Sequence, residues 1–353
     1  MITRRRAIAA LISAIAVAVA FAAAGSSSAQ SALPFKGVHL TAVNFGGVID
    51  TAERNAWEIP FGKLTGATLS DDLQDYAKLQ AQVESGDVTW NLSDTDAFFA
   101  NEECGKLFVP RDPKIVTSLS NALPGSVTNK CGVPTLAATT LLAYNTADFK
   151  KNPPTTWADF FNTKKYPGKR SVWNYVLNGV PEAALLADGV SPAHLYPLDV
   201  SRAFKKLQTI KSDILFATTL GQQQQQVASG QASMAMIFTG RLEGAVASGA
   251  KWAPVWNQNM RIWDNEAVVK GSANVKASMA FLEYLLKSSV QNAIVKYVPY
   301  TSMVKGPPPK TDALTKRFLA TSQEYKEGLN VDSTWWAQNY NKMTQLWTSF
   351  TTS

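Results

Sequence analysis

Strands and helices alternate in the first hundred residues, and this alternation constrains the fold more than any other feature of the sequence. Val38–Val43, Thr68–Ser70 and Trp90–Ser93 have the composition and patterning of strands. Helical segments lie between them, and the second, Tyr76–Ser85, is closed by Gly86. Short loops between such elements are typical of parallel sheets covered by helices, so we expect an α/β fold.

The first loop and the helix after it carry local signals. The loop is Asn44-Phe45-Gly46-Gly47, whose glycines allow a tight and flexible turn. Asp50 is followed three residues later by Glu53, which is the spacing of a capping box. We therefore expect Asp50 to be the N-cap of the helix. Pro60 should kink or restart this helix, because proline removes a main-chain donor.

A strand and a long helix are also predicted late in the chain, between Arg261 and Gly306. The strand covers Asn265–Val269, and the helix of roughly 20 residues has apolar side chains three and four positions apart. These side chains are Val275, Met279, Leu282, Leu286, Val290 and Ile294. Asp264 stands just before the strand. Taken alone, this aspartate is either solvated at a turn or facing a cleft between two lobes.

The length of 353 residues predicts two domains, since single cores stop growing near about 250–300 residues. Residues 1–29 have the pattern of an export signal: Arg4-Arg5-Arg6, an apolar run from residue 7 to residue 24, and small residues after it. A membrane anchor is the alternative, because the run is long enough to span a bilayer. Its alanine-rich character favours a cleaved signal. The paired arginines leave both the general secretory and the twin-arginine routes open.

The charge and the cysteines bear on partners and compartment. Lys and Arg number 34 and Asp and Glu 27, so removing the three arginines of the signal leaves 34 − 3 − 27 = +4. No basic run remains, which argues against nucleic acid as a partner. Cys104 and Cys131 are the only cysteines. Export to an oxidising compartment favours a disulfide between them, and two buried free thiols are the alternative.

Several kinds of chemistry find no support in the sequence. The only histidines are His39 and His194, and no Cys/His group has the spacing of metal ligands. No glycine-rich phosphate loop precedes a helix, and no Ser–His–acid set can be assembled. We therefore expect no metal, no cofactor and no catalytic residue, with a secreted hydrolase as the rival interpretation.

Acidic, aromatic and hydroxyl side chains remain at the ends of strands and helices, where open α/β sheets bind ligands. Aromatic rings together with carboxylates suit an organic cation. The candidates are Phe45, Asp94, Asp96, Thr139, Thr140, Glu182, Phe238, Thr239 and Asp264, with Trp173 as a further wall.

Several motifs resemble the periplasmic solute-binding proteins of the polyamine type, which bind spermidine or putrescine. The matching stretches are Lys78–Gly86, Trp90–Asp94, Trp157–Phe161, Lys165–Arg170, Ala184–Val190 and Lys270–Asn274. The resemblance implies a two-lobed type II periplasmic binding protein, each lobe a mainly parallel sheet with flanking helices and the ligand in the cleft between them. Lobe 1 would comprise residues 37–143 and 265–305, and lobe 2 residues 144–264 and 306–353.

The resemblance also implies roles for individual residues. Phe45 matches an aromatic of the first loop, Asp96 a polar ligand group, Glu182 an acidic contact, Phe238 a stacking ring, and Asp264 the carboxylate that receives an ammonium. Two positions depart from the family pattern. Arg241 stands where the family has an aspartate, and Glu266 where it has an aromatic residue. An arginine in the pocket would repel the second ammonium of a diamine.

We therefore expect a monomeric periplasmic protein that captures a small solute by hinge closure and delivers it to the permease of an ABC importer. A polyamine-like organic cation is the first interpretation of the ligand. The alternative is an amino-acid-like, opine-like or carboxylate solute, for which Arg241 would bind the negative group.

Overall fold

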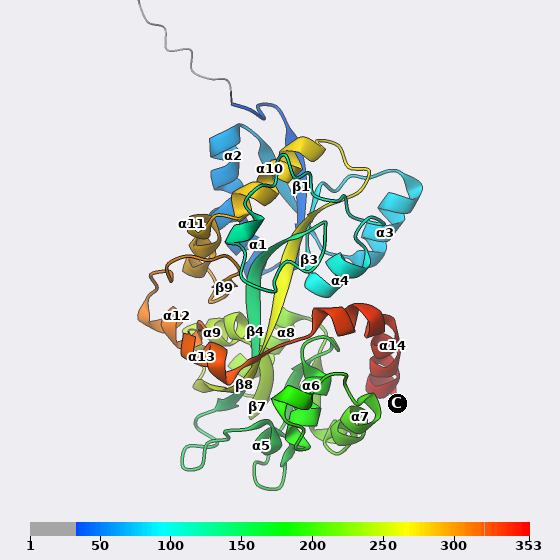
Figure 1. The fold of residues 1–353 in the computed structure, drawn as a ribbon. Coiled ribbons are helices and arrows are strands. Elements are labelled where there is room, and N and C mark those ends of the chain that lie inside the picture. Colours follow the sequence, from blue (N-terminus) through cyan, green and yellow to red (C-terminus); the bar gives the residue numbers. More distant parts are fainter. Residues whose placement is uncertain (1–32, 321) are drawn as a thin grey trace, which may run out of the picture. The chain divides into compact units, whose positions relative to one another are not determined.

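The structure is a computed structural model that describes residues 33–320 and 322–353 (Figure 1). The export signal expected over residues 1–29 lies outside these ranges. Within them, no helix has both the length and the apolar character needed to cross a bilayer.

The elements follow one another in the alternating order that the sequence predicts. The first part of the chain forms β1 (His39–Asn44), α1 (Val48–Glu53), the π-helix η1 (Arg54–Glu58), α2 (Ile59–Thr65), β2 (Thr68–Leu73), α3 (Tyr76–Ser85), β3 (Leu92–Asp96), α4 (Ala97–Glu102), η2 (Leu119–Asn121) and β4 (Val133–Asn145). The middle part forms α5 (Trp157–Phe161), β5 (Arg170–Trp173), α6 (Val180–Ala187), η3 (Pro192–His194), α7 (Val200–Gln208), η4 (Lys211–Asp213), β6 (Ile214–Ala217), α8 (Leu220–Ala228), β7 (Met234–Phe238), α9 (Thr239–Ala247) and β8 (Trp252–Val268). The last part forms α10 (Val275–Leu285), α11 (Ser288–Gln291), η5 (Asn292–Lys296), β9 (Thr301–Ser302), α12 (Ala313–Phe318), α13 (Ser322–Glu327), β10 (Leu329–Asn330) and α14 (Ser333–Thr352).

The strands form one mixed sheet in the order β2-β1-β3-β8-β4-β7-β5-β6, with β10 beside β8 and β9 beside β4. The pairs among β2, β1 and β3 are parallel, and so are the pairs among β7, β5 and β6. The pairs β3–β8, β8–β4 and β4–β7 are antiparallel. Two parallel groups are therefore joined through β4 and β8, as in the two-lobed periplasmic binding protein fold that the sequence predicts. We call these groups the β2-β1-β3 end and the β7-β5-β6 end.

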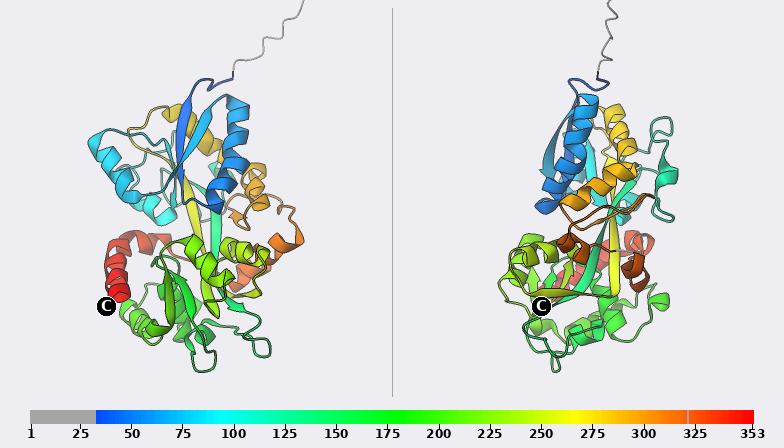
Figure 2. Two further views of the ribbon diagram at one scale, coloured as in Figure 1. Left: turned by 180° about the vertical axis from the view of Figure 1, so that it is seen from behind. Right: turned by 90° about the vertical axis from the view of Figure 1, so that its left-hand side faces the viewer.

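The two connecting strands are unusually long. β4 has 13 residues and β8 has 17, and Figure 2 shows both running between the two ends of the sheet. Their pairing shifts register between Pro134 and Ala137 and again between Thr140 and Leu142. Such irregularities increase local twist and bend a strand. The sequence predicts only Ala137–Tyr144 and Asn265–Val269 as strands here, so it underestimates both lengths.

The lobe boundaries given above remain a proposal. Residues 37–143 and 265–305 contain the β2-β1-β3 end, and residues 144–264 and 306–353 contain the β7-β5-β6 end. Since β4 and β8 pass through both sets of residues, the first two boundaries fall within strands, and the third lies in the segment after β9.

Two helices differ from their sequence predictions. The long helix after β8 is interrupted after Leu285 and continues as α11 and the 3-10 helix η5. Of its predicted apolar side chains, Val275 is half-buried, and the others are buried, namely Met279, Leu282, Leu286, Val290 and Ile294. The first helix begins at Val48 with Gly47 as N-cap, so the expected capping role of Asp50 is wrong. Glu53, the last residue of α1, is instead buried and only 3% exposed.

The expected disulfide is confirmed. Cys104 and Cys131 are bonded, at a sequence separation of 27, and the described residues include no free cysteine. Closing a loop of this length stabilises a protein by roughly 3–4 kcal/mol in the chain-entropy treatment. The bond ties the segment after α4 to the segment just before β4.

The last helix, α14, packs along the outside of the fold as expected (Figure 2). Asp332 caps it by accepting from the main-chain N–H groups of Thr334 and Trp335. Trp336 and Trp347 point inward and are almost fully buried. The indole of Trp347 donates to Asn174 Oδ1 over 2.7 Å, which fixes the helix beside the segment that follows β5.

Candidate functional site

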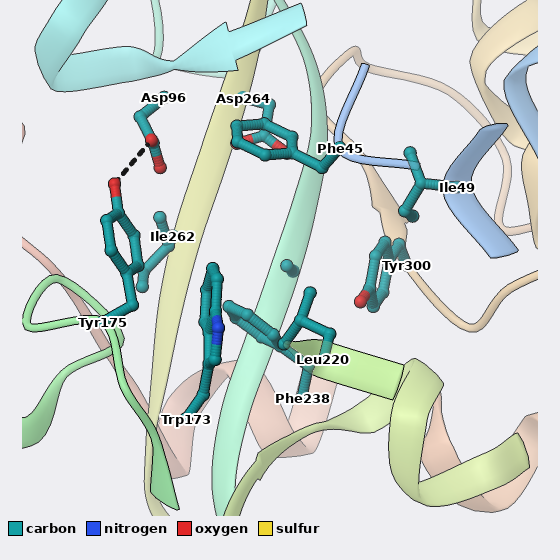
Figure 3. Close-up of a pocket in the computed structure, with 11 residues that line it drawn as sticks. Phe45, Ile49, Asp96, Trp173, Tyr175, Leu220, Phe238, Ile262, Asp264 and Tyr300 are labelled. Atoms are coloured by element: carbon teal, nitrogen blue, oxygen red, sulfur yellow. Dashed lines mark hydrogen bonds between the residues drawn. The ribbon is translucent and has the colours of Figure 1, made fainter. Parts of the chain in front are cut away.

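A small cavity of about 50 Å³ lies over one face of the β4–β8 pair (Figure 3). Residues from both ends of the sheet and from the connecting strands line it. They are Phe45, Ile49, Asp96, Ala138, Trp173, Tyr175, Leu220, Phe238, Ile262, Asp264 and Tyr300. A water molecule needs about 10–15 Å³ when the volume is measured this way, so the cavity suits a compact solute.

Five of the predicted ligand residues line this cavity. Phe45 comes from the loop after β1, Trp173 from the end of β5, and Phe238 from the end of β7. Trp173 lies between two other rings, 4.6 Å from Tyr175 and 6.1 Å from Phe238 between ring centroids. These aromatic faces surround the cavity with apolar and π surface, which suits the carbon chain or the cation of an amine.

The other two are Asp96 and Asp264, the only charged residues in the lining. They are cross-strand partners at the β3–β8 pairing, where Asp96 opposes Asp264 and Asp94 opposes Glu266. Opposed residues point to the same face of a sheet, and so do residues two apart in one strand. The cavity therefore ends at one pair of acids, and a second pair lies behind it.

Asp264 is the unpaired acid of the lining. Among the described residues its carboxylate has no hydrogen bond or ion pair, and only its main-chain oxygen accepts, from Thr135 Oγ1 over 3.1 Å. Burial raises the pKa of Asp264 well above its ordinary value, and the charges of Asp94 and Asp96 raise it further. Such a carboxylate stays ionised only beside a cation.

Asp96 is different, because its carboxylate has two donors. Tyr76 Oη donates to Asp96 Oδ2 over 2.7 Å and Tyr175 Oη over 2.9 Å. Burial raises the pKa of Asp96 to about 6, and the two phenols oppose that rise by stabilising the anion. Asp96 thus lines the cavity, but one of its carboxylate oxygens already accepts hydrogen bonds from two phenols.

Arg241 is not among the lining residues, but its guanidinium lies close behind them. A Cβ placed on Gly47 would lie 3.3 Å from Arg241 Nη1, so the guanidinium packs against the backbone of the Phe45 loop. Arg241 is 5% exposed, and its Nε has no hydrogen-bond partner among the described residues. Burial raises the pKa of Tyr300 to about 12, while Arg241 lowers it and Asp264 raises it. Tyr300 therefore lies within the electrostatic reach of both charges.

The structure places Thr139 and Glu182 away from the cavity lining. Thr139 is buried in β4 next to Ala138, and the alternation of a strand directs the two side chains to opposite faces. Glu182, in the first turn of α6, is fully buried. Its Oε1 accepts from Tyr196 Oη over 2.6 Å and from Trp336 Nε1 over 2.8 Å, so it anchors α14.

We expect Glu182→Gln to leave ligand affinity within about twofold of wild type and Glu182→Ala to destabilise the protein by about 1–3 kcal/mol. The amide of glutamine keeps the oxygen that accepts from Tyr196 and Trp336, whereas alanine leaves two buried donors unsatisfied. Calorimetric titration and urea unfolding of both variants measure these effects. A Gln variant with tenfold weaker affinity would restore Glu182 to the binding site.

Sequence reasoning missed six lining residues: Ile49, Ala138, Tyr175, Leu220, Ile262 and Tyr300. Tyr175 and Tyr300 carry the polar groups among them. Tyr175 follows Trp173 by two positions, a spacing that offered a signal because Trp173 was a candidate wall. Tyr300 lies at the end of the helical stretch that follows Asp264 in the sequence. It reaches the cavity because the chain pairs with β4 again directly after it, in β9. Within residues 33–320 and 322–353, no group of three or more His, Cys, Asp or Glu is arranged to hold a metal ion.

Comparisons with known proteins agree on one family. The family described as bacterial extracellular solute-binding protein matches residues 60–320. The gamma-aminobutyric acid-binding protein of Pseudomonas aeruginosa is 30% identical over 339 residues, which cover 93% of this chain and 92% of that protein. The solved structure of the Atu4243-GABA receptor is 31% identical with a TM-score of 0.80, covering 89% of this chain and 98% of that one. The structure of AgtB from A. tumefaciens R10 in complex with agropinic acid is 28% identical with a TM-score of 0.79, covering 90% and 99%.

Proposed function

Because this chain belongs to the bacterial extracellular solute-binding protein family, we propose that it captures a small zwitterionic amine, such as GABA, for an ABC importer. The chain is the solute-binding component of such a transporter and not an enzyme, so the rival interpretation as a secreted hydrolase is set aside.

The unpaired carboxylate of Asp264 is the observation on which the proposal rests. A buried carboxylate without a cation is costly, and desolvation strengthens its attraction to any ammonium that enters. Phe45, Trp173 and Phe238 supply rings for the carbon atoms beside that ammonium. The charge and the rings together favour a primary amine at the Asp264 end of the cavity.

Arg241 supports a negative group at the other end of the ligand. Its guanidinium has no carboxylate partner among the described residues, and guanidinium groups bind carboxylates with two parallel hydrogen bonds. Tyr300 feels the charges of both Arg241 and Asp264. A short chain with an ammonium at one end and a carboxylate at the other would lie across Tyr300 and join the two.

The same features argue against a polyamine, our first interpretation from the sequence. A diamine would bring its second ammonium toward Arg241, where like charges repel. The cavity of about 50 Å³ is also small for spermidine. The relatives named for GABA and for a complex with agropinic acid support an amino-acid-like or opine-like solute instead. Between those two, the small cavity favours the compact amino acid.

We also propose the compartment of the protein and the way in which it encloses its solute. We infer that the protein acts in the periplasm as a monomer and hands its solute to an inner-membrane permease. The arginine-led apolar segment at residues 1–29 supports export. We also infer hinge closure, with β4 and β8 as the connecting strands, because a ligand that contacts both ends of the sheet favours the closed arrangement by its differential affinity.

Calorimetric titration with four matched compounds tests the proposed ligand. GABA carries both charges, butylamine only the ammonium, butyrate only the carboxylate, and putrescine two ammonium groups. We expect GABA to bind at least about 100-fold more tightly than butylamine, butyrate or putrescine, because only GABA pairs both Asp264 and Arg241.

The variant Arg241→Gln separates the two ends of the ligand. It should weaken GABA binding by about 100-fold while changing butylamine affinity by less than threefold. Tighter binding of putrescine than of GABA by the wild type would return the site to the polyamine class. If none of the four compounds binds at millimolar concentration, the proposal for a small zwitterion fails.

A further inference from the structure

One hydrogen bond links the two ends of the sheet across the side of the cavity. Tyr175 lies two residues after β5, in the β7-β5-β6 end, and its phenol donates to Asp96 at the end of β3, in the β2-β1-β3 end (Figure 3). The bond measures 2.9 Å. It therefore spans residues from the two proposed lobes.

A second phenol reaches the same oxygen without crossing between the ends. Tyr76 is the first residue of α3, which connects β2 to β3, and it donates to Asp96 Oδ2 over 2.7 Å. Its oxygen also accepts from the main-chain N–H of Asp96 over 3.1 Å, and its ring stacks on Phe99 at 3.8 Å. Tyr76 thus holds the Asp96 carboxylate in place from its own side.

The C-terminal helix makes another crossing contact beside this one. Trp347 anchors α14 to Asn174, the neighbour of Tyr175, on the β7-β5-β6 end. From the same helix, Tyr340 lies 4.5 Å from Phe98 of α4 between ring centroids, and Ser333 accepts from Asn101 Nδ2 over 3.5 Å. These contacts between the ends lie on the same side of the cavity as the Asp96–Tyr175 pair, and a separate contact joins Arg241 to the Gly47 backbone.

We propose that Asp96 and Tyr175 form a closure latch, in which Asp96 acts as a positioning residue and Asp264 is the only carboxylate that pairs with the ammonium of the ligand. Tyr76 donates to the same carboxylate from within the β2-β1-β3 end, so its bond does not join the two ends. The latch holds the two ends together even in the ligand-free protein and slows release of whatever solute is enclosed. The hydrogen bond joins protein to protein, so it forms without any contact to the ligand.

The proposal goes beyond the identity of the ligand, and one link rests on the proposed function. An ammonium beside Asp264 would favour the ionised form of the neighbouring Asp96, because opposite charges stabilise each other at short range. An ionised carboxylate is the stronger acceptor for a phenol. Binding of an amine would thereby strengthen the latch, and a neutral or anionic solute would not.

The matched variants Tyr175→Phe and Tyr76→Phe test the latch. Each removes one phenol from Asp96, but only the first removes a bond between the ends of the sheet. Spin labels at Ala77→Cys and Gln208→Cys would report the distance between α3 and α7, and the native disulfide leaves no other free thiol among the described residues. Ligand-free protein is measured first, and GABA dissociation is then followed by stopped flow.

We expect a short-distance population in ligand-free wild type, and Tyr175→Phe should reduce its ratio to the open form about tenfold, since hydrogen bonds to charged groups have effects of this order. Tyr76→Phe should change that ratio by less than about threefold. The rate of GABA release should also rise about tenfold in Tyr175→Phe only. Equal effects of the two variants, no effect of Tyr175→Phe, or no closed population in ligand-free wild type would each overturn the latch. Distances that respond as expected in protein that does not bind GABA would support the latch and refute the proposed ligand.

Discussion

Asp264→Asn is expected to weaken GABA binding by about 100-fold or more while leaving the ligand-free protein at least as stable as wild type. Removing one partner of a buried charge pair typically costs about 2–5 kcal/mol of binding free energy. Without ligand, the asparagine removes a half-buried carboxylate near two other acids, and desolvation raises the pKa of that carboxylate well above its ordinary value. Loss of affinity together with retained or increased stability is typical of a residue kept for binding.

Calorimetry and urea unfolding of the same preparation measure both quantities. Asp87→Asn is the matched control, because it removes the same charge from an exposed position on the turn after α3. It should change neither GABA affinity nor stability by more than about 0.5 kcal/mol. If Asp264→Asn binds GABA as wild type does, Asp264 is only a half-buried strand residue and the ammonium must bind elsewhere.

The fold could be predicted from the sequence because strand and helix signals alternate strongly, and their order nearly determines a sheet of this kind. The positions of Asp96 and Asp264 were predictable for the same reason: both lie where the predicted strands meet the cleft. That Asp96 and Asp264 lie directly opposite each other was not predictable, because the register between strands distant in sequence has no local sequence signal. Tyr175 and Tyr300 were missed because each follows an element whose end meets the cavity only in the folded chain.

Glu182 and Glu53 show where local reasoning stops. Glu182 stands in the first turn of a helix, a position equally suited to a ligand and to a buried anchor, and only the distant Trp336 and Tyr196 select the anchor. Glu53 has the spacing of a capping residue. In the structure, α1 is followed by the π-helix η1 and by α2 with Pro60 near its start, and Glu53 and Glu58 lie on the buried face of these helices.

A set of buried acids results, beneath α1 and η1 and behind the cavity. Glu53 and Glu58 come from the helix, Asp71 from β2, Asp94 from β3 and Glu266 from β8. Carboxylate oxygens of all five are buried without a donor from another kind of group, and Glu53 with Asp94 and Glu58 with Asp71 lie close enough to share a proton in a hydrogen bond. Burial raises the pKa values of Glu53, Asp94 and Glu266 well above the ordinary range, and it raises that of Glu58 to about 9. The folded protein thus holds protons there that the unfolded chain releases.

The free energy of unfolding should therefore fall as pH rises from about 5 to 8, and Glu58→Gln should reduce that fall. In this range folded Glu58 keeps its proton, since its pKa is raised to about 9, whereas the unfolded side chain has lost it above its ordinary pKa near 4.5. The stability contributed by the protonated group is complete below the unfolded pKa and is lost as pH rises toward the folded one. A single such group changes stability by at most about 1.4 kcal/mol per pH unit, so the variant should lose about 1 kcal/mol less per unit than wild type.

Urea unfolding at pH 5, 6, 7 and 8 measures the slopes, with Glu84→Gln at an exposed position of α3 as the control that keeps the wild-type slope. Equal slopes for Glu58→Gln and wild type would mean that Glu58 is ionised in the folded protein and that a cation or water compensates it.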